Sequence, residues 1–169
     1  PSIASIVFAS TTTVGTVNLG AVTDAGSGVY TVSIQGALAG SVTISATISS
    51  VSVTSTSALA VTASSVVASL AFSTQPSSST DTDSNLSTQP VLKLYDSAGN
   101  VVVSNNSASI TLTAFSTTNC SGSEITGGIS AAANPLTVIA GVATFSQVKV
   151  LKTNAVRIKA SDGTHTACS

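Results

Sequence analysis

The residues of this chain that could do chemistry are few and scattered along its length. The single histidine, His165, has no serine or cysteine nucleophile at a recognised motif spacing. The run DTDSN at residues 81–85 begins like a calcium loop, yet Leu86 stands where an EF-hand needs glycine and no glutamate follows at the twelfth place. We interpret this run as a solvated loop, and we expect no enzyme activity, no cofactor and no metal site.

Two other kinds of site also rank below a structural role. Asp96, Glu124 and Asp162 could contribute to a calcium site between domains, but they do not cluster in the sequence. Lys93 and Asn154 raise the idea of a self-forming isopeptide bond. That bond needs a buried lysine beside a carboxylate, and nothing in the sequence places such partners together.

Cys120 and Cys168 are the two cysteines of the chain, and they lack the clustered spacing of a zinc site. The Ser/Thr-rich composition suggests an extracellular setting, where disulfides form and persist. We predict a disulfide between them, with two buried free thiols as the alternative. Closing a loop of this length stabilises a fold by on the order of 4 kcal/mol in the chain-entropy model.

Three asparagines fit the N-glycosylation sequon, which requires serine or threonine two residues later. In a chain this rich in Ser, Thr and Asn, such matches also arise by chance. They matter only if the source glycosylates its secreted proteins. The candidate acceptors are Asn85, Asn105 and Asn119.

The composition narrows the possible partners. Charged residues make up 7% of the chain and the net charge is -1, so phosphate binding to nucleic acid is disfavoured. No apolar run approaches the roughly 18 residues of a membrane helix. The first residues lack the positive segment of a signal peptide, so we expect a mature or excised piece.

Alternation of apolar and polar residues predicts β-strands throughout, and no segment has a helical period. In the first part we predict short strands at residues 3–9, 16–19, 28–34 and 42–49, divided by glycine-rich turns at residues 24–28 and 36–40. The longest alternating run places four residues on a buried face. They are Val42, Ile44, Ala46 and Ile48.

In the second part, residues 89–103 predict a hairpin whose turn is DSAGN at residues 96–100. Leu92 and Leu94 lie on one face of its first strand, and three valines form the returning strand. Residues 116–134 predict a long surface loop that the disulfide ties down. Further strands are predicted at residues 67–72, 108–115, 136–139, 142–145, 148–151, 155–160 and 164–168.

Two stretches carry a resemblance to a known family. Residues 23–48 hold Asp24, Gly26, Gly28, Tyr30 and Val32 in a D-x-G-x-G-x-Y-x-V pattern, and resemble the later strands of filamin and invasin immunoglobulin-like domains. The pieces LAFSTQP, QPVLKLYDSAGNVV, GVATFSQVKV and AVRIKASDG, in that order, resemble the immunoglobulin-like repeats of large bacterial surface and secreted proteins. The closing ACS is similar to the variant whose last strand is bridged to the central loop.

The patterns and the resemblance together predict an all-β chain of two immunoglobulin-like antiparallel β-sandwich domains in tandem, residues 1–64 and 65–169. The first domain is short, because an immunoglobulin sandwich takes roughly 100 residues. We therefore expect it either to be a partial domain or to be completed by a strand from a neighbouring chain.

The expected function is structural: a module of an extracellular or cell-surface fibre, filament or stalk. Its expected partners are copies of itself or neighbouring immunoglobulin-like domains of the same polymer. The alternative is a carbohydrate- or receptor-binding module of a secreted adhesin or enzyme, with a host or cell-surface glycan as partner. This alternative ranks lower because sugar sites usually expose aromatic rings, and the chain has no tryptophan, with Tyr30 and Tyr95 both on predicted strands.

Overall fold

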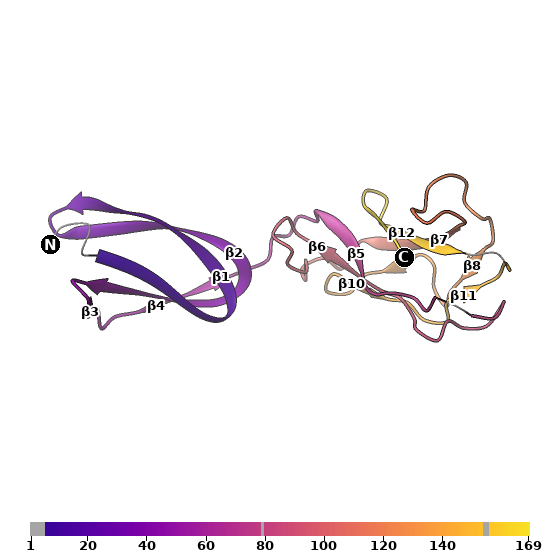
Figure 1. Cartoon of the computed structure of the whole chain (residues 1–169), viewed down its shortest axis with the longest axis horizontal. Coiled ribbons are helices and arrows are strands. Elements are labelled where there is room, and N and C mark those ends of the chain that lie inside the picture. The colour runs from indigo at the N-terminus through magenta and orange to yellow at the C-terminus, as the bar shows by residue number, and fades with distance from the viewer. Residues whose placement is uncertain (1–5, 79, 154–155) are drawn as a thin grey trace. The chain divides into compact units, whose positions relative to one another are not determined.

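The computed structural model describes residues 6–78, 80–153 and 156–169. Every regular element in these ranges is a β-strand, which confirms the predicted all-β class (Figure 1). The chain divides into two compact units, Pro1–Ala63 (unit 1) and Ser64–Ser169 (unit 2). Within the described ranges there is no helix with the length and apolar character needed to cross a membrane.

Unit 1 is built on one long antiparallel hairpin. Strand β1 (Ile6–Gly26) pairs with β2 (Val29–Ile48) from Ile6 opposite Ile48 to Gly26 opposite Val29. The short strands β3 (Val51–Ser52) and β4 (Ser57–Val61) pair with the other edge of β2 near its end. The predicted turn at residues 24–28 is present and joins the two long strands.

The prediction of several short strands in unit 1 is wrong, and so is the predicted turn at residues 36–40, which lie inside β2. Both strands instead bend back on themselves near their middles (Figure 1), where the register shifts around Gly15 and Gly40. Both glycines have positive φ, and a Cβ on Gly15 would lie 2.8 Å from the Cα of Gly40. The glycines therefore allow a close backbone crossing within continuous strands, which local sequence cannot distinguish from a turn.

The bend gives unit 1 two layers. Residues 6–12 of β1, residues 40–48 of β2, β3 and β4 form a wide layer. Residues 16–26 of β1 and 29–38 of β2 form a narrow layer of two strands. The layers meet at Gly36, where a Cβ would lie 2.7 Å from Cγ1 of Val61.

Unit 2 contains two larger sheets and one small one. The first sheet has the order β10-β6-β5 and the second β13-β12-β7-β9, while β11 pairs with β8. The strands of the first sheet are β5 (Ser69–Thr74), β6 (Val91–Tyr95) and β10 (Val142–Thr144). Those of the second are β7 (Ser109–Phe115), β9 (Leu136–Thr137), β12 (Arg157–Ser161) and β13 (Thr166–Cys168). The small sheet holds β8 (Ile129–Ser130) and β11 (Lys149–Val150).

The core of unit 2 lies between the two larger sheets. Leu92 and Leu94 of β6 are fully buried, as the alternation predicted, and they belong to one cluster with Ile110 and Leu112 of β7. Phe145, just after β10, is the largest fully buried side chain among the described residues. Because both sheets contribute to one apolar cluster, unit 2 is a β-sandwich.

The predicted hairpin at residues 89–103 is only partly correct. Its turn forms, but the returning valines make a single bridge, between Tyr95 and Val101, instead of a strand. The reason is competition, since β5 pairs with one edge of β6 and β10 with the other. The predicted strand at residues 155–160 appears as β12, and Ala155, like Asn154, lies outside the described residues.

Candidate functional site

The predicted disulfide is present and joins the loop after β7 to the end of β13. Cys120 and Cys168 are bridged with an S–S distance of 1.99 Å and Cα atoms 5.7 Å apart, and Cys120 is buried. The surrounding segment is not entirely loop, because β8 and a bridge between Phe115 and Glu124 lie within it. The disulfide thus fastens the last strand of unit 2 to the connection between β7 and β8.

Asp96 is a buried carboxylate that organises the turn after β6. Its Oδ1 accepts hydrogen bonds from the backbone N–H groups of Ala98 (2.9 Å) and Asn100 (2.8 Å), and its Oδ2 accepts one from the N–H of Ser64 (2.9 Å). The Asn100 side chain donates to both oxygens. Burial opposes ionisation, but these hydrogen bonds outweigh it and lower the pKa of Asp96. The group therefore ties the first residue of unit 2 to this turn.

His165 lies in the turn between β12 and β13 beside Asp162. Asp162 accepts hydrogen bonds from the backbone N–H groups of Thr164 (2.8 Å) and His165 (2.6 Å), and its Oδ2 lies 3.0 Å from Nδ1 of His165. Burial opposes ionisation of Asp162, yet the hydrogen bonds to it lower its pKa. The pair is a local turn contact whose geometry resembles that of the Asp96 turn.

The carboxylates weighed as calcium ligands lie apart. Asp83 forms an ion pair with Lys149 (Oδ1–Nζ 3.2 Å), and its side chain is 74% exposed. Asp96 and Asp162 each occupy their own turn. Within residues 6–78, 80–153 and 156–169, no three His, Cys, Asp or Glu side chains group closely enough to hold a metal ion.

The three sequon asparagines differ in accessibility. Asn85 is exposed and forms a single β-bridge with Lys149. Asn105 is half-buried, and its Oδ1 accepts hydrogen bonds from the N–H groups of Ser107 and Ala108. Asn119 is exposed beside the disulfide, with Oδ1 bonded to Ser121. Asn85 and Asn119 are therefore the better placed acceptors.

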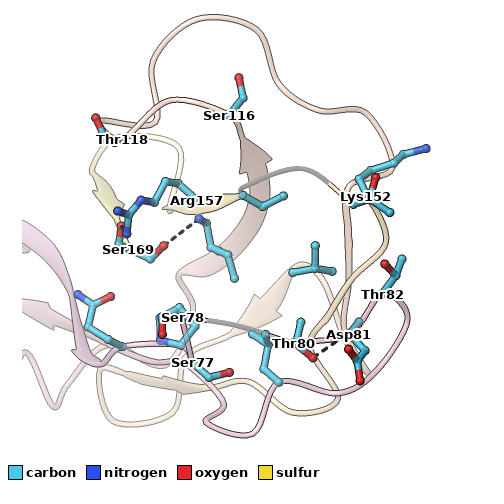
Figure 2. Close-up of a pocket in the computed structure, with 17 residues that line it drawn as sticks. Ser77, Ser78, Thr80, Asp81, Thr82, Ser116, Thr118, Lys152, Arg157 and Ser169 are labelled. Atoms are coloured by element: carbon cyan, nitrogen blue, oxygen red, sulfur yellow. Dashed lines mark hydrogen bonds between the residues drawn. The ribbon is translucent and has the colours of Figure 1, made fainter.

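Unit 2 has a cavity of about 770 Å³ between the segment after β5 and the start of β12 (Figure 2). Its floor includes the buried side chains of Leu86 and Ile158. Arg157 lies at one side, where its Nη1 donates to the carbonyl oxygen of Ser169 at 3.2 Å. The polar and charged residues of the lining are Gln75, Ser77, Ser78, Thr80, Asp81, Thr82, Ser116, Thr118, Lys152, Thr153, Arg157 and Ser169.

Sequence reasoning missed the most unusual surface of the chain, which is in unit 1. Among its described residues, three hydrophobic side chains are buried: Ile6, Val42 and Ile44. Ile48, predicted to face the core, is 40% exposed. Seven large hydrophobic residues of unit 1 are 40–70% exposed, namely Val7, Val14, Val29, Ile34, Leu38, Ile48 and Val51. The sequence feature that indicated this surface is the small number of residues in unit 1, which is too few to bury both of its layers.

Comparison of the chain with protein-family models, with curated proteins and with solved structures finds no match.

Proposed function

We propose that this chain is a structural module of an extracellular surface fibre, filament or stalk, built from two immunoglobulin-like β-units and without a catalytic role. In this proposal the unit 2 sandwich is a self-contained spacer. Unit 1 is the element through which neighbouring chains associate, because a β-strand from one chain completes the sheet of the next.

The incomplete burial of unit 1 is the observation that carries this proposal. Proteins associate mainly by burying apolar side chains, so a unit that leaves many of them exposed is suited to association. Seven large apolar side chains of unit 1 remain at least 40% exposed, against three in the described part of unit 2, which has more residues. Association that covers these side chains would recover the hydrophobic free energy that unit 1 lacks alone.

The chemistry of the surface supports an extracellular, mechanical role. The Cys120–Cys168 disulfide is compatible with an oxidising compartment. Charged residues are 7% of the chain, so association must depend on β-pairing and apolar contact more than on ion pairs.

Electron microscopy of the purified chain, combined with hydrogen exchange, tests the proposal. We expect elongated assemblies at high concentration, and slower exchange of unit 1 backbone amides as the concentration rises, while unit 2 exchange stays constant. Dispersed single particles at every concentration, with unit 1 exchange unchanged, would contradict it.

A second candidate function is saccharide binding by unit 2, and the 770 Å³ cavity favours it. Hydroxyl groups, two basic side chains (Lys152 and Arg157) and one acidic side chain (Asp81) surround an apolar floor, which suits a polar ligand such as a saccharide. A glycan array probed with the full chain tests this. Binding that Arg157→Gln abolishes and Lys159→Gln preserves would support it, because Lys159 lies over the Phe115 ring and does not line the cavity.

A further inference from the structure

The narrow layer of unit 1 lacks a strand that the wide layer has. In the wide layer β2 has β1 on one side and β4 on the other, over residues 40–44. In the narrow layer β2 pairs with β1 alone, since no described strand pairs with the other edge of residues 31–38. At residues 40–44 the wide layer is therefore three strands across, whereas the narrow layer is two strands across.

Within the narrow layer, the exposed large apolar side chains lie on β2, the strand that has this open edge. Ile34 is directly opposite Leu19 in the register, yet Ile34 is 42% exposed while Leu19 is half-buried. Ile34 also shares a face with Gly36, which packs on Val61 of β4, so this face points toward the other layer. Leu38, at the end of the same segment, is 42% exposed as well. Coverage is thus missing on the β2 side of the narrow layer.

The edge lacks the charges and prolines that block pairing between chains, although the register with β1 shifts opposite Gly36–Leu38 and opposite Val32–Ile34. Proteins protect exposed edge strands with lysine, proline or inward-pointing charges. Residues 31–38, TVSIQGAL, contain no charged residue and no proline. Asp24 is the single charged residue in the sequence of residues 1–63, so two copies of this edge meet without electrostatic repulsion and a charged partner gains no ion pair there.

We propose that the β2 edge at residues 31–38 pairs with the same edge of a second copy of this chain, in antiparallel orientation about a two-fold axis. The two narrow layers then form one continuous four-stranded sheet, and Ile34 of each copy is covered. A two-fold interface is self-complementary, so one uncharged edge supplies both halves. This inference rests on the structural role proposed above and specifies one of its contacts. A two-fold pair closes on two chains, so elongated assemblies also need a second contact elsewhere on the chain.

Sedimentation equilibrium of the full chain tests the pairing. We expect dimers to form before any longer assembly as the concentration rises. For the variant T31K/Q35K we expect a dimer dissociation constant raised by roughly tenfold or more, because each side of the paired edge then carries two added positive charges. Both positions are exposed, so the lysines are tolerated in the monomer. Salt at about 0.5 M should restore much of the association by screening, an effect that a folding defect would not produce.

The matched control is T23K/N18K, because Thr23 and Asn18 are the exposed cross-strand partners of Thr31 and Gln35. This variant adds the same charge to the same face of the narrow layer, but on β1, and we expect little change in dissociation constant. An equal or larger effect of the control, or a monomer at every concentration, would overturn the pairing. If T31K/Q35K still formed elongated assemblies, the proposed pairing at residues 31–38 would be wrong, but the proposed structural role would stand.

Discussion

Unit 1 and unit 2 use the same residue types and the same antiparallel pairing, but they bury their apolar side chains to different extents. Unit 2 closes two sheets around a continuous cluster that includes Leu92, Ile110 and Phe145. Unit 1 folds one hairpin over itself and buries three hydrophobic residues among those described. The difference shows that β-pairing alone does not make a core, because a second layer of matching width is also required.

The largest expected contrast is between the same substitution in the two units. Leu92→Ala in unit 2 should reduce the free energy of unfolding by about 2–5 kcal/mol, since the side chain is fully buried. Leu59→Ala in β4 of unit 1 should cost about 1 kcal/mol, because Leu59 is half-buried. Urea unfolding with hydrogen exchange assigned to each unit measures both. Equal costs would mean that unit 1 has a complete core of its own.

The second-largest contrast in stability between the two units should come from removing the disulfide. With Cys120→Ala and Cys168→Ala together, unit 2 should lose on the order of 4 kcal/mol, because the unfolded chain regains the freedom of a long loop. Unit 1 has no cysteine in its sequence and should be unaffected. The two urea midpoints, compared with and without reductant for the unsubstituted chain, check this result. A loss in both units would contradict their independence.

The bend of unit 1 gives a third test. Gly40→Ala should destabilise unit 1 by about 3 kcal/mol, because Gly40 has positive φ and an added Cβ would meet the backbone oxygen of Val14. Gly99→Ala in unit 2 is the control, since Gly99 has positive φ (84°) with nothing near its added Cβ, and should cost about 1–2 kcal/mol. Differential scanning calorimetry distinguishes the two. A smaller loss at Gly40 would mean that the bend can move.

The smallest expected effect is on pH dependence, in unit 2 alone. The pKa of Asp96 is lowered in the folded state, so its stabilising contribution is complete above about pH 5 and is lost as the pH falls through 3.8, the ordinary value, and below. Asp96→Asn should lower the stability of unit 2 at pH 7. It should also reduce the further loss of stability as the pH falls. Asp83→Asn, at an exposed side chain, is the control. Thermal melts across about 5 pH units, from pH 2 to 7, compare the two variants. The same pH dependence of the melting temperature in both would contradict this role of Asp96.

Much of unit 2 was predictable from sequence because its signals are local. Alternation identified Leu92 and Leu94 as core residues. The two cysteines lack the spacing of a zinc site, so a disulfide was the favoured prediction for them. The returning strand at residues 101–103 was mispredicted because β10, far along the chain, takes the edge of β6 that a hairpin needs. No local pattern contains that competition.

Unit 1 was less predictable for a different reason. Glycines at residues 36 and 40 are compatible both with a turn and with a bent strand. Which of the two forms depends on the close approach of Gly40 to Gly15. Ile48 has the alternation of a core residue, yet its exposure depends on how much of the second layer lies above it. The open edge at residues 31–38, too, could be found only once the width of each layer was known.

The bridge between Cys120 and Cys168 also sets how far unit 2 can lengthen under load. Tension applied along the chain passes directly from one sulfur to the other, so the 48-residue span between them stays slack even when the sandwich is pulled apart. At roughly 3.5 Å per extended residue, about 170 Å of contour is withheld from the stretch. A stalk made of such modules would therefore lengthen on unfolding only through the residues that precede Cys120 in each module.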